Sequence, residues 1–283
     1  MHLACLGVLF TGAPLVALLL CGFTYFIRMF GITAVYHRYF AHRAYKTSRP
    51  LQFLLACLGC SALQKGPLWW AAHHRRHHRY SDTEDDPHSP HATSFWWSHV
   101  GWVLSDEHED TPWNSIKDWS RYPELRWLDR NHWVPGIVLA VGCFLFGLWT
   151  GVGAWACLVW GFVVSTVLLY HGVFTVNSLC HLFGRRRYDT RDDSRNNALV
   201  ALITLGEGWH NNHHHYQSSA NQGFFWWEID VSYYLIRLFG LLGLVWDIRK
   251  PGEKALRHRG LKASPERDPA EAREEELVEA KAG

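Results

Sequence analysis

Two short runs rich in histidine mark this 283-residue sequence as a candidate for metal chemistry. The first reads WWAAHHRRHH and covers residues 69–78, and the second reads GEGWHNNHHH and covers residues 206–215. Each contains a histidine followed, after two other residues, by a histidine pair. Residues three and four positions apart lie on one side of an α-helix. Each run therefore presents three imidazoles together, and we expect each triplet to hold one metal ion.

Two further motifs add histidines, HRYFAH at residues 37–42 and NSLCH at residues 177–181. His37 and His42 are five residues apart, about 140° around an α-helix. They reach a common site only if the helix ends or turns there. Nine imidazoles exceed the four ligands of a single zinc ion, which favours two metal ions. Neutral imidazole suits Zn, Cu, Fe or Ni, so spacing leaves the element open. The nine candidates are His37, His42, His74, His77, His78, His181, His210, His213 and His214.

Other common kinds of site are disfavoured by missing motifs. A carboxylate-rich di-iron bundle needs two E-x-x-H motifs, and only Glu207 with His210 matches here. H-E-x-x-H, G-x-S-x-G, P-loop and G-x-G-x-x-G motifs are absent from the sequence. A net charge of only +2 argues against nucleic acid as a partner. The seven cysteines lie mostly in apolar runs and are expected to be buried and unpaired.

Long uncharged segments predict an integral membrane protein. Residues 3–27 contain no charged side chain, and residues 134–176 are long enough to cross a bilayer twice, with TGVG at residues 150–153 as the turn. We expect spans at about residues 3–30, 134–150 and 154–176. The TGAP motif at residues 11–14 is either a kink or the turn of a hairpin whose first arm is too short to span. The N-terminus therefore looks incomplete.

Charge placement predicts the orientation of the hydrophilic parts. All 28 Lys and Arg fall at Arg28 or later, and none falls in the TGVG turn. By the positive-inside rule, residues 37–133 and 177–249 form one cytosolic cap that carries every histidine motif. Two shorter apolar segments, residues 51–63 and 231–246, are expected at the interface or against the cap. We expect an all-α membrane domain over residues 1–249 and a charged, solvated, disordered or partly helical tail over residues 250–283.

HRYFAH, HRRHH, NSLCH and GEGWHNNHH resemble the four histidine boxes of membrane fatty acid desaturases of the acyl-CoA delta-9 (stearoyl-CoA) type. YDTRDDSRNN and YPELRWLDRNHWVP are similar to the connecting segments of bacterial members. The resemblance implies four membrane helices in two hairpins under a cytosolic cap that holds two Fe ions. It implies that the nine histidines ligate the irons and that Asn177 reaches one iron through water.

The resemblance also implies a reaction and its partners. The reaction is the O2-dependent formation of a cis double bond at C9–C10 of a long-chain acyl-CoA or acyl-lipid. Electrons come from an external donor of the ferredoxin, rubredoxin or cytochrome b5 type with its reductase. The expected location is the lipid bilayer of the bacterial inner membrane, with the site facing the cytoplasm.

Several other residues lie near the four histidine boxes in sequence. Glu207, one turn before His210, is the candidate catalytic acid and would orient a ligand, although a capping or solvated acid fits too. Asp82, Glu84, Asp85 and Asp86 could act similarly. His73, an acid in animal relatives, and His215 are expected beside the ligands or on the surface. No ligand role is expected for histidines 2, 88, 91, 99, 108, 132, 171 and 258, and the candidates for holding a coenzyme A phosphate are Arg75, Arg76, Arg185, Arg186 and Arg187.

Three alternatives remain open. A related histidine-box hydroxylase or alkane monooxygenase would insert oxygen instead of forming a double bond. A metal transporter or a haem-binding membrane protein would need ligands inside the spanning helices. His171 is the only histidine within an apolar span, so these last two are disfavoured.

Overall fold

The computed structural model describes residues 1–257 and is almost entirely helical, which confirms the predicted fold class. Two helices are long and apolar enough to cross a membrane, Leu15–Ala41 and Ala154–Leu182, with mean hydropathies of 2.0 and 1.8. A third candidate span is the bent pair of Pro123–Arg130 and Val134–Thr150, which meet at 66°. The elements are η1 (Leu3–Gly7), α1 (Val8–Thr11), α2 (Leu15–Phe30), η2 (Gly31–Ala41), β1 (Lys46–Thr47), α3 (Arg49–Cys60), α4 (Pro67–Tyr80), η3 (Trp97–Gly101), α5 (Trp102–Leu104), η4 (Asp106–His108), η5 (Trp113–Ile116), α6 (Lys117–Ser120), α7 (Pro123–Arg130), α8 (Val134–Thr150), α9 (Ala154–Leu158), η6 (Val159–Val164), α10 (Ser165–Leu182), α11 (Ala198–Ile203), α12 (His210–His215), α13 (Val231–Leu241), β2 (Val245–Trp246) and α14 (Glu253–Arg257).

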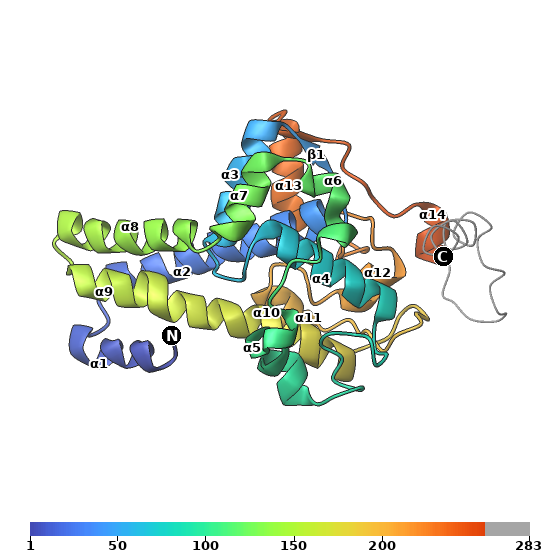
Figure 1. The fold of residues 1–283 in the computed structure, drawn as a ribbon, viewed down its shortest axis with the longest axis horizontal. Coiled ribbons are helices and arrows are strands. Elements are labelled where there is room, and N and C mark those ends of the chain that lie inside the picture. Colours follow the sequence, from blue (N-terminus) through green and yellow to red (C-terminus); the bar gives the residue numbers. More distant parts are fainter. Residues whose placement is uncertain (258–283) are drawn as a thin grey trace.

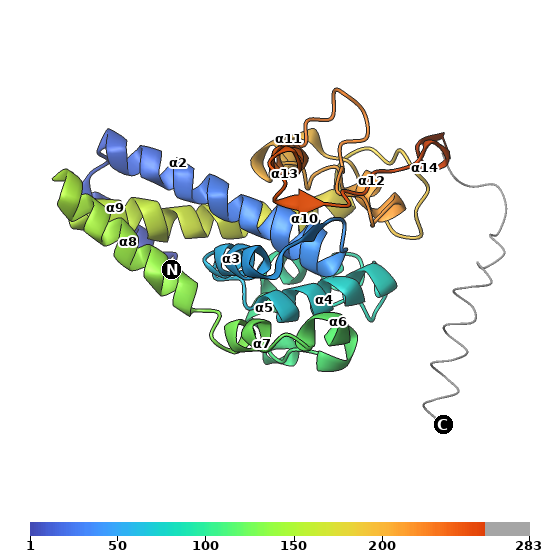
Figure 2. The ribbon, with the colours of Figure 1, turned by 90° about the horizontal axis from the view of Figure 1, so that it is seen from above.

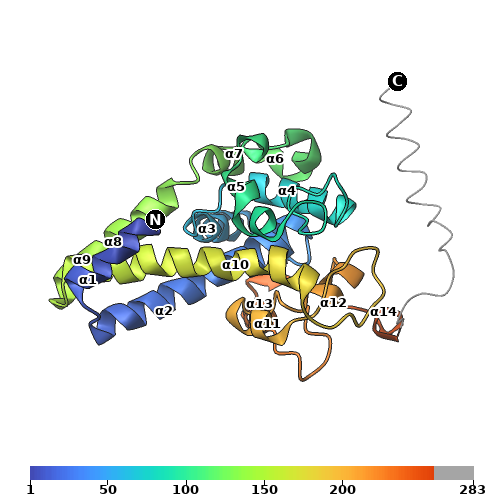
Figure 3. The same cartoon turned by 90° about the horizontal axis from the view of Figure 1, so that it is seen from below.

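Helices α2, α8 and α9 extend together from one side of the molecule, and a cap of shorter helices lies on the other side (Figures 1 and 2). The predicted turn between α8 and α9 is confirmed. Its Gly151 and Gly153 have φ of +69° and +117°, a backbone region that favours glycine. Helix α10 continues from this hairpin into the cap (Figure 3). The spanning helices therefore reach directly into the region that holds the histidines.

The N-terminal segment forms a hairpin with α2, so the hairpin alternative is right and the kink is wrong. Its first arm runs only from Leu3 to Thr11, and Gly12 makes the turn with φ of +64°. The arm packs along η6 and α10. A Cβ on Gly7 would lie 3.0 Å from Val159 of η6, and His2 Nε2 lies 2.9 Å from His171 Nε2 of α10. The first arm is too short to span, as expected, and does not complete the four membrane helices that the resemblance implies.

Helices α3 and α13 are apolar but too short to span a bilayer, and both pack against η2. Gly59 of α3 leaves room for the ring of Tyr36 on η2, since a Cβ there would lie 2.2 Å from Tyr36 Cε1. Asp230 caps α13 by accepting a hydrogen bond from Tyr233 N. The two strands pair antiparallel, Lys46 with Trp246, and tie the end of η2 to the C-terminal part of the cap.

The predicted tail begins with the exposed helix α14, over Glu253–Arg257. The remainder of the predicted disordered tail, residues 258–283, lies outside the described residues.

Candidate metal centre

The nine histidines predicted from the sequence gather in two adjoining clusters inside the cap. In each cluster the candidate ligand atoms lie within 4.8 Å of one another. Four elements contribute, η2, α4, α10 and α12, together with His42 directly after η2. The first cluster contains His37, His42, His74, His78 and His213, and the second contains His77, His181, His210 and His214.

In the first cluster the Nε2 atoms point at one another. Four pairs, 37–213, 42–74, 74–78 and 78–213, have Nε2–Nε2 distances of 2.9 Å. For a metal–imidazole bond of about 2.0–2.1 Å, the length found for zinc, two ligands at right angles lie about 2.9 Å apart. The spacing of the five nitrogens therefore fits a single bound metal ion.

In the second cluster His181 Nε2 lies 3.0 Å from His210 Nε2. The Nε2 atoms of His77 and His214 are buried and have no hydrogen-bond partner among residues 1–257. A buried polar atom without a partner is costly, and a coordinated metal would satisfy both. Asn177 lies one turn before His181 on α10 and lines the same cavity as His77 and His210. This donor set also fits a metal ion.

The expectation that each triplet holds one metal is wrong. His74 and His78 belong to the first cluster, whereas His77 belongs to the second. Helix α12 divides its histidines in the opposite sense, with His213 in the first cluster and His210 in the second. At about 100° per residue, positions i and i+4 lie about 40° apart, while position i+3 lies about 60° to the other side. Each helix therefore runs between the clusters and contributes to both.

His37 and His42 meet because η2 is a π-helix. Its wider turn pairs residue i with residue i+5, and His42 N donates to His37 O at 3.1 Å. The imidazole centroids are consequently only 4.8 Å apart. The sequence prediction that the helix ends at this motif is confirmed, since η2 ends at Ala41. The wide turn was not foreseen.

Four carboxylates hold the outer Nδ1 atoms of the histidines. Asp86 lies 3.0 Å from His77 Nδ1, and Asp82 lies 2.9 Å from His181 Nδ1. Glu207 pairs with His37 Nδ1, and Asp192 pairs with His214 Nδ1 at 2.7 Å. A carboxylate that accepts from Nδ1–H leaves the Nε2 lone pair for a metal and fixes the orientation of the ring.

Of the acids singled out from the sequence, Glu207, Asp82 and Asp86 thus contact histidines of the clusters. Glu84 and Asp85 are exposed and make no such contact within the described chain. Asp192 was missed, because it lies in the loop between α10 and α11, 22 residues before its partner His214, at no spacing that a motif could indicate. His88 was also missed. It stacks on His77 with centroids 4.3 Å apart.

The electrostatics of the centre favour metal binding. Burial, together with the neighbouring imidazoles, lowers the pKa of His42, His74, His78, His210 and His213 well below the usual value, so these rings are neutral. Burial opposes ionisation of Asp82, but the hydrogen bond and charge of His181, together with hydrogen bonds from Asp193 N and Ser89, outweigh it and lower the pKa to about 2. Neutral imidazole is the form that binds metals, and the carboxylates supply negative charge around them.

Glu207 also belongs to a buried ion network. Its Oε1 lies 3.0 Å from Arg38 Nη2, and Arg38 Nη1 reaches Asp230 Oδ1 at 2.8 Å. All three side chains are buried. The alternative that Glu207 is a solvated acid is therefore wrong, since Glu207 links a histidine of the first cluster to the core of the cap.

Because Asp192 holds the Nδ1 of His214, its replacement should weaken metal binding. Asp192→Asn keeps the size of the side chain but removes the charge that holds His214. Loss of such a partner typically costs about 10–100-fold in metal affinity or activity. We expect faster loss of metal to a chelator, measured as metal per chain over time. Asp189→Asn in the same loop, where Asp189 pairs with Arg186 and with no histidine of either cluster in the described chain, should behave as wild type. Equal metal retention by the two variants would contradict the assignment.

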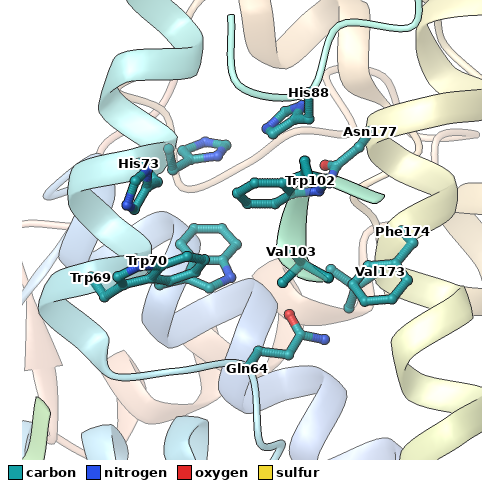
Figure 4. Close-up of a pocket in the computed structure, with 11 residues that line it drawn as sticks. Gln64, Trp69, Trp70, His73, His88, Trp102, Val103, Val173, Phe174 and Asn177 are labelled. Atoms are coloured by element: carbon teal, nitrogen blue, oxygen red, sulfur yellow. The ribbon is translucent and has the colours of Figure 1, made fainter. Parts of the chain in front are cut away.

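Two cavities adjoin the clusters. One has a volume of about 420 Å³, part of it open to solvent, and combines His37, His77, His210 and Glu207 with the apolar side chains of Met29, Ile32, Val173 and Val176. The other has a volume of about 450 Å³, also partly open to solvent, and shares Trp70, His74, Val173 and Asn177 with the first (Figure 4). Four of its lining residues have buried nitrogens without a hydrogen-bond partner in the described chain, Gln64 Nε2, His73 Nδ1, His88 Nδ1 and Trp102 Nε1.

The extra histidines lie outside both clusters. His73 is buried and lines the cavity of Figure 4, so it is not a surface residue. His215 stacks on Tyr188 at 3.9 Å and its Nε2 lies 2.9 Å from Ala255 O. Histidines 2, 91, 99, 108, 132 and 171 belong to neither cluster, and His258 lies outside the described residues.

The fold and site define a helical membrane protein with a buried, histidine-rich site for two metals. The sequence model of the family "Fatty acid desaturase" matches residues 12–239. Three similar proteins are acyl-CoA 5-desaturase AL21 of Anemone leveillei (36% identical over 262 residues, 89% of this chain and 78% of that protein), the sn-1 stearoyl-lipid 9-desaturase of Anabaena variabilis (40% over 226 residues, 79% and 80%) and the hex-5-enoyl-[acyl-carrier protein] acetylenase of Moorena producens (38% over 252 residues, 83% and 77%).

The chain therefore belongs to the fatty acid desaturase family and is an O2-dependent oxidoreductase. The resemblance seen in the histidine boxes is confirmed at the level of the family. Membership implies a di-iron centre, which agrees with the two buried clusters. The metal-transporter and haem-protein alternatives no longer apply.

Proposed function

We propose that this desaturase introduces a cis double bond at C9–C10 of a long-chain acyl-CoA. The nine histidines would hold two Fe ions, with Asn177 beside the second cluster. The reaction removes two hydrogens from adjacent methylenes and takes two electrons from an external donor, with two protons, so that O2 leaves as two waters. The main support is that both clusters adjoin one apolar cavity.

When bound, the irons would supply the activated oxygen that breaks unactivated C–H bonds, which side chains cannot do. The chain's own residues would position the groups. Glu207, Asp82, Asp86 and Asp192 hold the rings from their outer nitrogens, and burial keeps water away from the centre. Glu207, which also lines the cavity, is proposed as the catalytic acid.

The acyl chain would occupy the cavity beside the clusters. Met29, Ile32 and Val176 offer apolar contacts, and His77 and His210 lie in the same wall. Each methylene gains about 0.8 kcal/mol on leaving water but almost nothing on leaving lipid. The cavity therefore contributes position more than affinity, and a methylene held beside the clusters meets the oxidant in a fixed geometry.

The polar end of the substrate would lie in the adjoining cavity of Figure 4. Trp102 Nε1 and Gln64 Nε2 are hydrogen-bond donors without acceptors in the described chain, and an acyl carbonyl is an acceptor. No Arg, Lys or acid lines this cavity, so the phosphates of coenzyme A would bind outside it. Among the arginines considered for them, Arg75 and Arg187 already pair with Asp118 and Glu228. Arg76, Arg185 and Arg186 are exposed. Arg186 pairs with Asp193, which leaves Arg76 and Arg185 as the exposed candidates without an ion pair among the described residues.

The names of the relatives include CoA, lipid and acyl-carrier-protein substrates and double bonds at both the 5- and the 9-position. The electron donor is proposed to be of the ferredoxin, rubredoxin or cytochrome b5 type. The proposed location is the bacterial inner membrane, with the cap on the cytoplasmic side. Residues 1–249 would form the membrane desaturase domain, and residues 250–283 would form the tail.

Expression in a desaturase-deficient bacterial host tests this function. The fatty acids are analysed by gas chromatography with mass-spectrometric location of double bonds, beside a His77→Ala variant as the inactive control. A new C9–C10 cis alkene is expected only with the wild type. An alkene at another position would contradict the proposed position, and a hydroxylated fatty acid would favour the hydroxylase or monooxygenase alternative. Assays with purified acyl-CoA and with acyl-lipid then test the carrier.

A further inference from the structure

A positively charged hollow of about 610 Å³ lies apart from the catalytic cavities, where η2 ends and β1 pairs with β2. Arg43, Lys46, Asp247, Ile248 and Arg249 line this cationic hollow. Lys46 Nζ lies 2.7 Å from Asp247 Oδ2, and Arg43 reaches Asp118 only at 3.7 Å. Arg249 has no ion-pair partner among the described residues. Three cations against one lining carboxylate leave an excess of positive charge.

The backbone of the hollow is held in an unusual conformation. Arg43 and Asp247 have φ of +52° and +51°, a left-handed region that residues other than glycine adopt only at an energetic cost. Arg43 N donates to Tyr39 O at 3.0 Å, and Arg249 N donates to Ala44 O at 2.9 Å. Such strain persists only where the surroundings fix it. The backbone that carries the charged side chains of the hollow is therefore held in place by its surroundings.

An exposed apolar edge adjoins the hollow. It comprises Leu241, Leu242, Leu244 and Trp246, at the end of α13 and in β2, which are 79%, 63%, 41% and 46% exposed. Figure 1 shows α13 lying across the direction of α2, between the membrane-length helices on the left and α12 on the right. Exposed leucines and tryptophan beside cations are typical of segments that rest in the membrane interface.

We propose that the cationic hollow binds the headgroup phosphate of a membrane phospholipid while the adjoining apolar edge rests in the bilayer interface. A phosphate is the anion that a bilayer presents at the boundary between apolar and aqueous phases, and Arg and Lys are its usual partners. Coenzyme A also carries phosphates, but no residue of the hollow lines either catalytic cavity. The lipid site is separate from the proposed acyl path and goes beyond desaturation.

The test measures lipid retained by the purified, metal-loaded full chain. Native mass spectrometry is run in detergent with added phosphatidylglycerol, and in a parallel arm with a galactolipid that has no phosphate. Lys46→Gln/Arg249→Gln should weaken phosphatidylglycerol retention about 10- to 30-fold, since each interfacial cation contributes about 1 kcal/mol. Galactolipid retention should stay unchanged. The charge-matched control is Lys254→Gln/Arg257→Gln on the exposed helix α14, which should bind both lipids as wild type does.

A third arm replaces lipid with coenzyme A. Loss of coenzyme A binding with retention of phosphatidylglycerol in Lys46→Gln/Arg249→Gln would overturn the proposal, because the hollow would then hold the acyl carrier. Equal phosphatidylglycerol retention by the wild type and this variant would overturn it as well. Arg249→Gln alone keeps the test usable if the double variant does not accumulate. The Arg249 backbone bonds to Ala44 and Ala220 do not depend on its side chain.

Discussion

Replacing His77 with alanine is expected to abolish desaturation and to release one of the two metal ions. His77 is one of only four imidazoles in the second cluster, and its Nε2 is one of the two buried Nε2 atoms there with no hydrogen-bond partner among residues 1–257. The variant also leaves the buried Asp86 carboxylate without its imidazole, which adds to the cost. Metal per chain by elemental analysis and double bonds by gas chromatography measure the two effects.

The neighbouring variant His78→Ala is expected to release the other metal. His78 faces the first cluster although it is adjacent to His77 in sequence, since consecutive helical residues point about 100° apart. Mössbauer spectra of ⁵⁷Fe-loaded protein distinguish an iron with five imidazoles from one with four. Each variant should lose a different signal, and His215→Ala, outside both clusters, should lose neither. Loss of the same signal from both variants would mean that His77 and His78 bind the same metal ion. Retained desaturation by His77→Ala would contradict the assignment of His77 as a metal ligand.

The sequence predicts the parts of the site that depend on local spacing. Uncharged runs of 20 or more residues define the spans, and the i, i+3, i+4 pattern brings His74, His77 and His78 to one side of a helix. Local spacing does not say how many metals that side meets. Two clusters form around α4 because α12 lies opposite it with the same pattern, and only the packing of the two helices determines which histidine joins which cluster.

Contacts between distant segments could not be predicted in this way. Asp192 finds His214 because the loop after α10 folds back over the second cluster. His37 and His42 lie close together because the π-helix η2 forms hydrogen bonds between residues i and i+5. No residue type in that segment requires a π-helix. The hairpin at the N-terminus was likewise left open, because Gly12 and Pro14 fit a kink as well as a turn.

The conservative variant Glu207→Gln separates a positioning role from a catalytic one. Glutamine fits the space of Glu207, but Glu207 meets Arg38 with Oε1 and His37 Nδ1–H with Oε2, and in glutamine one of these two oxygens becomes an NH2 group that cannot accept. Arg38 keeps Asp230, so the buried guanidinium retains one carboxylate and the fold should lose only about 1–3 kcal/mol. Metal affinity should fall about 10–100-fold, as for other lost partners of ligand histidines.

The rate per bound metal then decides the role of Glu207. If Glu207 acts only through His37, fully loaded Glu207→Gln should turn over at close to the wild-type rate, and the defect should appear as weaker metal retention. If Glu207 itself moves a proton in the cavity that it lines, the loaded variant should remain slow at every metal concentration. Glu228→Gln is the matched control, because Glu228 is equally buried and pairs with Arg187 but contacts no histidine of either cluster. Normal metal retention together with a normal rate in Glu207→Gln would exclude both roles, since the carboxylate would then neither hold His37 nor take part in the chemistry.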